Sequence, residues 1–146
     1  MRALVQRVSR AQVTVDGEVV GAIGRGLCVF VGATHADTDA QAGRLAAKVW
    51  NLRVMPDDDG VMNRSIADAG GEVLVVSQFT LYGDTSGGRR PSWIAAPRPE
   101  QAEPLVERVV AELRSLGATV ATGRFRTVMQ VELVNDGPVT LWIEVD

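Results

Sequence analysis

Residues 26–33 read GLCVFVGA, an apolar run that no charged residue interrupts. The run is too short for a typical helix, is rich in β-branched and aromatic residues, and has a glycine at or near each end, so it predicts a buried strand. Cys28, the only cysteine of the chain, lies inside it and is expected to be a buried packing residue.

Two strand-like segments precede this run. Residues 1–8 alternate apolar and polar side chains, which is the period of a half-buried strand. Residues 11–24, AQVTVDGEVVGAIG, predict a hairpin whose turn is Asp16-Gly17, because a type I′ turn needs two residues that tolerate a positive φ.

Two main helices are predicted after the run. Thr38 and Gln41 have the spacing of a capping box, and apolar residues follow at helical spacing, which predicts a helix over residues 38–51. A second helix is predicted over residues 100–116, where one face is apolar and Gly117 supplies the C-terminal cap.

The remaining apolar segments predict strands. They are the short LRVM at 52–55, a strong strand over 71–79, and three closing strands over 118–123, 127–134 and 138–145. No repeat, linker or change of composition divides the chain, so residues 1–146 are expected to form one domain. The order predicts an α+β fold of mostly antiparallel β-sheets, with the two helices covering one side.

The composition is that of an ordinary globular domain, with 46% hydrophobic and 23% charged residues. No apolar run is long enough to span a membrane, and the first ten residues lack the apolar core of a signal peptide. A single cysteine excludes an internal disulfide or a thiolate metal cluster and fits a reducing compartment, so a cytoplasmic location is expected.

The net charge of −3 argues against a general polyanion binder, but the arginines are clustered. Arg89 and Arg90 lie together in a Gly/Pro-rich loop, while Arg124 and Arg126 flank Phe125. Fourteen of the fifteen basic residues are arginine, which suits bidentate contacts with phosphate and is equally compatible with a biased genome composition.

The usual catalytic constellations are missing from the sequence. His35 is the only histidine and lies in a loop before the first helix, where an exposed position or a local contact is expected. Residues 57–59 are three adjacent acids, but calcium loops alternate their ligands, so a solvated turn is favoured over a metal site. No phosphate-binding P-loop is present. An enzyme with this sequence is expected to use no metal, no cofactor and no obvious general base.

Polar residues interrupt the apolar strand at 71–79. Ser77, Gln78 and Thr80 stand at its carboxyl end, next to the long glycine-rich loop TLYGDTSGGRRPSW. Sites often form at such strand ends, although the same residues could serve only to satisfy nearby backbone groups.

Residues 131–145, VELVNDGPVTLWIEV, contain two strand-like arms around Asn135-Asp136-Gly137-Pro138. One interpretation is a β-hairpin corner. The other is a segment that presents its main chain to a ligand, because Pro138 lacks a pairing N–H and only an X-Pro bond is readily cis.

Three motifs together resemble one known family. SQFTLYGD at 77–84, GRRPS at 88–92 and VELVNDGPVT at 131–140 are similar to the D-aminoacyl-tRNA deacylases of the bacterial and eukaryotic type. The first 27 residues resemble the start of that family, and the likeness runs from Met1 to about Asp146.

The resemblance implies a hydrolase that cleaves the ester between a D-amino acid and the 3′-terminal adenosine of tRNA, and so proofreads chirality in translation. It implies a three-layer β-β-α fold and a homodimer with its active sites at the interface. Gly137-Pro138 is expected to be cis and to enter the partner's pocket, where its carbonyls face the substrate's α-amino group. Since glycine has no side chain to exclude, glycyl-tRNA is an expected second substrate.

Roles for single residues follow from their motif positions. Either the backbone N–H groups of Phe79 and Thr80 hold the developing oxyanion while the ribose 2′-OH helps to activate water, or the Thr80 hydroxyl attacks the ester. The remaining expected site residues are Ser77 and Gln78 at the adenosine end, Arg7 and Asn135 with Gly137 and Pro138, Phe125 and Met129 near the pocket wall, and Arg89 and Arg90 on tRNA phosphates.

Two other classes of function compete with this interpretation. A nucleic-acid binding module would use the Arg89 and Arg90 loop without chemistry, but the net charge and the few aromatic residues speak against it. A purely structural dimer would explain Gly137-Pro138 as an interface and leave residues 77–80 without a role.

Overall fold

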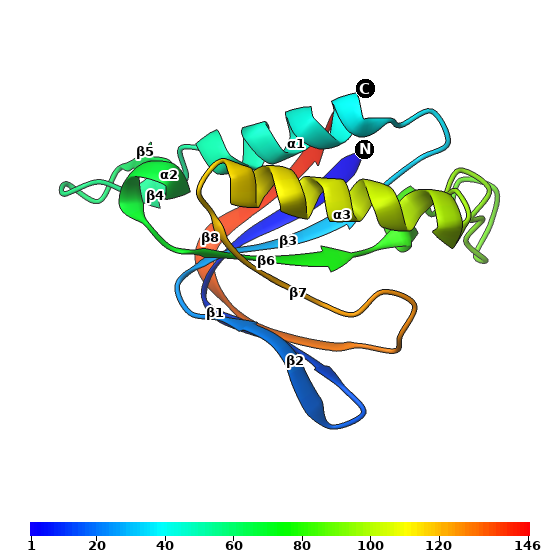
Figure 1. Ribbon diagram of the computed structural model, residues 1–146, viewed down its shortest axis with the longest axis horizontal. Helices are drawn as coiled ribbons and strands as arrows, with labels where there is room; N and C mark the ends of the chain where they lie inside the picture. Colours follow the sequence, from blue (N-terminus) through cyan, green and yellow to red (C-terminus); the bar gives the residue numbers. More distant parts are fainter.

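The computed structural model describes residues 1–146, in which a curved sheet carries α1 and α3 on one face (Figure 1). The strands are β1 (Arg2–Val15), β2 (Glu18–Ile23), β3 (Gly26–Gly32), β4 (Met55–Pro56), β5 (Met62–Arg64), β6 (Glu72–Ser77), β7 (Thr119–Thr122) and β8 (Gln130–Glu144). The helices are α1 (Asp39–Asn51), α2 (Ile66–Ala69) and α3 (Pro99–Ser115), and a 3₁₀ helix, η1, covers Phe79–Tyr82. None of the helices is both long and apolar enough to cross a membrane.

The main sheet is mixed, and it has six strands. Its order is β2-β1-β3-β6-β7, with β8 paired to the other side of β1. All pairs that β1 makes are antiparallel, as expected, whereas β3, β6 and β7 run parallel to one another. The order of predicted elements does not indicate these parallel pairs. They arise because α1 and α3 lie between successive strands, and a helical crossover returns the chain in the same direction.

The last strand of the chain, β8, continues on both sides of the corner at residues 135–138. On one side of the corner Val134 lies opposite Arg10, and on the other side Thr140 lies opposite Gln6. Both arms therefore pair with β1 and not with each other, so the hairpin interpretation is wrong. The register shifts on either side of Val8, which lets β8 carry its corner residues as a bulge while β1 continues past them.

The core lies on both faces of the central strands. In β3, Leu27, Val29 and Val31 belong to a cluster of 24 buried residues that includes the inner faces of α1 and α3. Cys28, which alternates with them, packs in a second cluster on the opposite face with residues of β1, β2 and β6. A strand buried on both faces has no polar positions, which explains the unbroken apolar run. Burial raises the pKa of the Cys28 thiol to about 12.

Two local predictions are confirmed. Asp16 and Gly17 both have positive φ, at 50° and 79°, and connect β1 to β2. Thr38 caps α1, where its side chain accepts a hydrogen bond from the Ala40 N–H while the Gln41 side chain accepts from the Thr38 N–H. In both cases the signal is contained within four residues and needs no distant contact.

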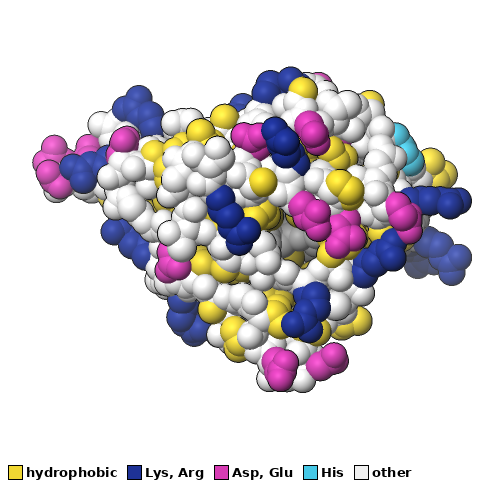
Figure 2. Space-filling view, in the orientation of Figure 1, with side chains coloured by type: hydrophobic (Ala, Val, Ile, Leu, Met, Phe, Trp, Pro, Cys, Tyr) yellow, Lys and Arg dark blue, Asp and Glu magenta, His cyan; other side chains and the backbone are white.

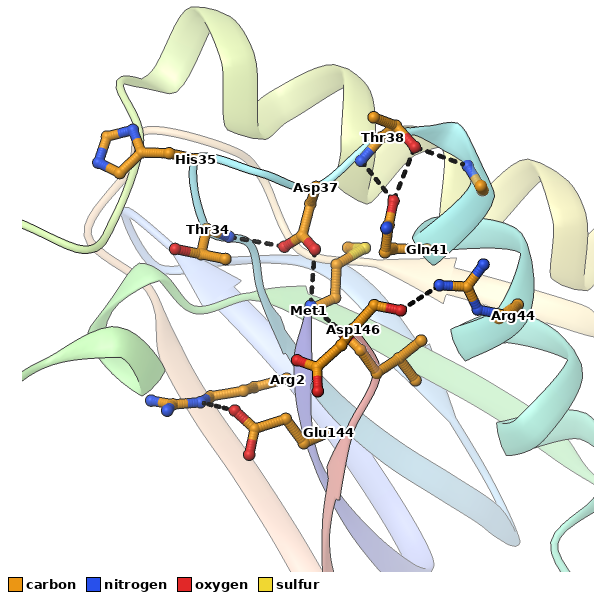
Figure 3. A network of polar contacts seen from close by, with 12 residues as sticks. Met1, Arg2, Thr34, His35, Asp37, Thr38, Gln41, Arg44, Glu144 and Asp146 are labelled. Atoms are coloured by element: carbon orange, nitrogen blue, oxygen red, sulfur yellow. Dashed lines mark hydrogen bonds and ion pairs between the residues drawn. The ribbon is translucent and has the colours of Figure 1, made fainter.

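A buried ion pair ties the two ends of the chain to the start of α1 (Figure 3). The Met1 ammonium donates to Asp37 Oδ1 at 2.9 Å and to the Val145 carbonyl at 2.7 Å. The second oxygen of Asp37 accepts from the Thr34 N–H at 2.7 Å. The side chains of Met1 and Asp37 are 0% and 4% exposed, so neither charge has water as a substitute partner.

Replacing Asp37 should therefore destabilise the fold. In Asp37→Asn the buried ammonium loses its counter-charge, and we expect the free energy of unfolding to fall by about 3–5 kcal/mol. Asp39→Asn, at a carboxylate 70% exposed and 4.0 Å from Arg108, is the control and should change it by less than about 1 kcal/mol. Urea unfolding followed by tryptophan fluorescence measures both, and equal, small losses would contradict the assignment.

Candidate functional site

A cleft of about 560 Å³ opens where the parallel strands β3 and β6 end. Its floor comes from the ends of these strands, and its walls from the segment before α3, the first turns of α3 and the β7–β8 connection. The lining residues are Val31, Gly32, Ala33, Val76, Ser77, Gln78, Phe79, Trp93, Ala96, Pro97, Arg98, Pro99, Ala102, Val106, Phe125, Arg126, Thr127, Met129 and Val131. Most of the lining is apolar with a few polar groups, which is typical of a small-molecule site.

At the floor of the cleft the strand β6 turns into the 3₁₀ helix η1. The Gln78 N–H still donates to the Val31 carbonyl at 2.8 Å, so the strand is held to β3 up to this residue. Phe79 and Thr80 are the first two residues of η1, and the first N–H groups of a helix have no acceptor within it. Both residues are exposed, and Phe79 lines the cleft.

The Thr80 hydroxyl has no basic group as its partner. It accepts a hydrogen bond from the Gln78 side-chain amide, which cannot take up a proton. His35, the only histidine, is engaged elsewhere, because its Nε2 donates to the Ile94 carbonyl at 2.7 Å. The expected exposed position of His35 is confirmed, whereas its contact is not local, because Ile94 belongs to a loop far along the chain.

The wall formed by residues 93–97 is fastened to the loop before α1. Thr34 donates to the Ala95 carbonyl at 2.7 Å, next to the His35 contact with Ile94. The ring of Trp93 meets Phe79 edge to face, with centroids 5.3 Å apart. Gly83 makes room for this arrangement, since a Cβ there would lie 2.5 Å from the Trp93 ring. The Trp93 ring thus fixes the position of the Phe79 ring beside the cleft.

Arg2 anchors the far end of η1. Its Nη1 donates to the Leu81 carbonyl at 2.9 Å, and its Nε pairs with Glu144 at 2.8 Å. The guanidinium also lies over the Tyr82 ring at 4.2 Å and near the Trp142 ring at 5.5 Å. Burial raises the pKa of Tyr82 to about 12, so the phenol is neutral beside this cation at any working pH. Figure 3 shows Arg2 reaching toward Glu144.

The corner at residues 135–138 is held by Arg7, which is buried and only 8% exposed. Its guanidinium donates to the carbonyls of Val54 at 2.7 Å, Asp136 at 3.2 Å and Gly137 at 3.3 Å. The Asn135 side chain donates to the carbonyls of Arg7 at 2.9 Å and Val139 at 3.1 Å. The peptide bond between Gly137 and Pro138 is cis. Both residues are exposed, so a fixed piece of main chain faces outward.

The structure brings together only part of the predicted site. Ser77, Gln78, Phe79, Phe125 and Met129 line the cleft, with Thr80 directly after them. Arg89 and Arg90 are exposed in the loop closed by the Asp84–Ser92 bridge and do not line the cleft.

The corner lies away from the cleft within one chain. Arg7 pairs with Leu27 at the start of β3, whereas Val31, at its end, pairs with Ser77. Four residues of strand separate these levels, which is about 13 Å along the sheet.

Some residues of the site are not predicted from the sequence. Trp93 and Arg98 line the cleft, and Arg2 binds the end of η1 outside the lining; all three positions depend on contacts made across the fold. The proline-rich segment 91–99 was the available signal, because a rigid, irregular stretch next to a glycine-rich loop is a common wall of a binding site.

Comparison with known proteins gives consistent matches. The family model described as D-Tyr-tRNA(Tyr) deacylase matches residues 4–144. The chain is 62% identical to a D-aminoacyl-tRNA deacylase of Symbiobacterium thermophilum, over 99% of this chain and 95% of that protein. It is 60% identical to one of Heliobacterium modesticaldum, over 99% and 96%. A solved structure named c-Myc DNA Unwinding Element Binding Protein superposes with a TM-score of 0.95 at 41% identity, covering 100% of this chain and 99% of that one.

The hydrogen bonds of Arg7 make a prediction about the corner. In Arg7→Lys the ammonium cannot reach all three carbonyls in the same plane, so we expect a loss of about 1–3 kcal/mol in the free energy of unfolding and faster amide exchange at residues 135–139. Arg10→Lys is the matched control on the same strand, because its pair with Glu132 is 59% exposed on both sides. Unchanged exchange at the corner in Arg7→Lys would show that Arg7 does not hold it.

Proposed function

Because the chain belongs to the D-aminoacyl-tRNA deacylase family and is a hydrolase that removes D-amino acids from tRNA, we propose that fixed main chain from a second copy senses the handedness of the amino acid. In this proposal the cleft binds the 3′-terminal adenosine with its ester, and residues 137–138 of the other copy close it over the α-amino group. One observation carries the proposal: a buried arginine immobilises carbonyls on an exposed corner that lies far from its own cleft.

The proposed homodimer has a free surface on which to form. Strand β8 pairs with β1 alone, so its other edge is open beside the corner. Val134, Leu141 and Trp142 on this strand are 41%, 37% and 51% exposed. An open edge with apolar side chains favours association with another chain. Since the corner and the cleft are apart within one chain, a second copy is what would unite them.

Backbone is well suited to rejecting one enantiomer. Discrimination of roughly 10⁴-fold corresponds to about 5.5 kcal/mol. A side-chain pocket that differs by a methylene supplies only about 1–3 kcal/mol. Arg7 binds the Asp136 and Gly137 carbonyls, and Asn135 binds the chain next to the corner, so the corner cannot move aside and would reject by overlap an L side chain directed at it. A D side chain points out of the site in this arrangement, which lets one enzyme act on many amino acids.

We propose that the chemistry relies on backbone donors. The N–H groups of Phe79 and Thr80 would hold the developing oxyanion, which is worth about 3–4 kcal/mol, while the ribose 2′-OH helps to activate water. The absence of a base beside the Thr80 hydroxyl supports this mechanism over nucleophilic attack, because an unaided hydroxyl is a weak nucleophile. An aminoacyl ester is already activated toward hydrolysis, so oxyanion stabilisation together with positioning of the ester and the water is sufficient for catalysis.

The other residues have supporting roles in the proposal. Ser77, Gln78, Phe125 and Met129 would surround the adenosine, since they line the cleft between the floor and the β7–β8 connection. Arg89 and Arg90 would meet phosphates of the tRNA body from their exposed loop.

The chirality mechanism predicts a particular order of substrates. D-tyrosyl-tRNA and glycyl-tRNA should be deacylated, while L-tyrosyl-tRNA and L-alanyl-tRNA should resist by roughly 10³-fold or more, because only they place a side chain against the corner. Release of labelled amino acid over time measures all four. Equal resistance of glycyl- and L-alanyl-tRNA would contradict the mechanism, and binding of D-tyrosyl-tRNA without turnover would favour a nucleic-acid binding module.

The backbone mechanism predicts that the Thr80 hydroxyl is dispensable. Thr80→Ala keeps both N–H groups, so kcat with D-tyrosyl-tRNA should stay within about tenfold of the original. Rapid quenching followed by mass measurement of the intact protein tests for a covalent intermediate. A loss of about 10³-fold or more together with an aminoacyl ester trapped on Thr80 would establish nucleophilic attack instead.

A further inference from the structure

A second hollow of about 400 Å³ continues from the cleft, between α3 and β7. Ser77, Val106, Phe125 and Met129 line both, so the two spaces meet at the end of the cleft that is proposed to hold adenosine. Five other lining residues matter for what the hollow can bind: Glu103, Glu107, Val110, Arg114 and Arg124. Figure 2 shows a hollow near the centre of this face, with acidic side chains along its upper rim.

Both acidic and basic side chains line this hollow, and none of them has an ion-pair partner within the chain. Glu103 and Glu107 stand one turn apart on α3, and neither takes part in an ion pair of the chain. Arg124 faces them from the β7–β8 connection, also without an acidic partner. Arg114 donates to the Val120 carbonyl at 3.0 Å, which fixes it at the far end. The site therefore offers acceptors on one rim, a cation on the other and apolar side chains between them.

We propose that this hollow binds the penultimate nucleotide of the tRNA, the cytidine that precedes the terminal adenosine. The inference rests on the proposed function, because it takes the adenosine to lie between Ser77, Phe125 and Met129. All tRNAs end in CCA, so the nucleotide that leaves the cleft toward the 5′ side is always a cytidine. The hollow is the space that continues from that end.

The chemistry of cytidine matches the two rims. A carboxylate accepts a hydrogen bond from the exocyclic N4 amino group of cytosine, and Glu103 and Glu107 provide such acceptors. The phosphate between the two nucleotides lies at the junction of the hollow and the cleft. Arg124 lines the hollow next to Phe125, which lines both spaces, and in the proposal its guanidinium binds that phosphate. Val106, Val110 and Met129 supply an apolar surface for the base.

Uridine should be a poor substitute at this position. It carries a carbonyl oxygen where cytidine has the amino group, and two carboxylates facing that oxygen would repel it. The hollow thus selects the nucleotide that every tRNA presents and adds binding energy without touching the amino acid.

Small synthetic substrates test this proposal directly. D-tyrosyl-adenosine, D-tyrosyl-cytidylyl-adenosine and D-tyrosyl-uridylyl-adenosine differ only in what reaches the hollow. We expect kcat/KM to rise about 5–100-fold when cytidine is added, and to rise much less with uridine. In Glu103→Gln/Glu107→Gln the preference for cytidine over uridine should disappear, because an amide can donate as well as accept. In Arg124→Ala both dinucleotides should lose most of their advantage over D-tyrosyl-adenosine.

The ratio of kcat/KM between dinucleotide and adenosine substrates cancels any general effect of a substitution. Arg25→Ala, at the turn between β2 and β3, is the control and should leave this ratio unaltered. Equal kcat/KM for all three substrates, or variants with an unchanged cytidine preference, would overturn the nucleotide site alone. No turnover of any D-tyrosyl substrate, D-tyrosyl-tRNA included, would instead overturn the proposed function.

Discussion

The buried guanidinium of Arg7 is the interaction on which the account of this protein depends. Removing a charged group from water is unfavourable unless the group is paired and hydrogen-bonded, and Arg7 has three backbone carbonyls and the Asp136 carboxylate, at 3.1 Å, as its partners. These carbonyls come from the segment after α1 and from the corner of β8, which are far apart in the sequence. Because the guanidinium is planar and its donors point in fixed directions, the corner has one position relative to the sheet. Main chain held in this way can serve as a rigid surface, which a flexible loop cannot.

The direction of the strands decides what that surface can reach. The parallel strands β3 and β6 end together at one edge of the sheet, and the cleft forms there between η1, the wall at residues 93–97 and α3. Arg7 holds the corner at the other end of β3, and the open edge of β8 lies beside it. In the proposed proofreading site these two parts therefore come from two copies of the chain. Each copy has one cleft and one corner, so a two-fold axis would pair the cleft of each copy with the corner of the other.

The sequence predicts those features whose cause is local. The Asp16-Gly17 turn, the Thr38 cap and the buried strand at residues 26–33 each depend on a few neighbouring residues, and all three are confirmed. The parallel pairing of β3 with β6 and the passage of β8 through the corner depend on which strand lies beside which, and a pattern of single residues does not contain that information. Within the cleft, the motif identifies Ser77, Gln78 and Phe79. It does not identify Trp93, nor Arg2 at the end of η1, because their contacts with Phe79 and Leu81 exist only in the folded chain.

The stereoselectivity of mixed dimers tests the central claim most directly. One subunit carries Ala96→Trp, which fills its cleft and leaves its corner intact. The other carries Gly137→Ala with Pro138→Ala, which alters its corner and leaves its cleft open. The two subunits carry different tags, are co-expressed, and the mixed dimer is purified through both tags. If the corner acts in the cleft of the other copy, the open cleft receives an intact corner, and the mixed dimer rejects L-tyrosyl-tRNA while it hydrolyses D-tyrosyl-tRNA. If the mixed dimer accepts L-tyrosyl-tRNA as readily as the corner variant does by itself, the corner does not act across the interface and the account is wrong.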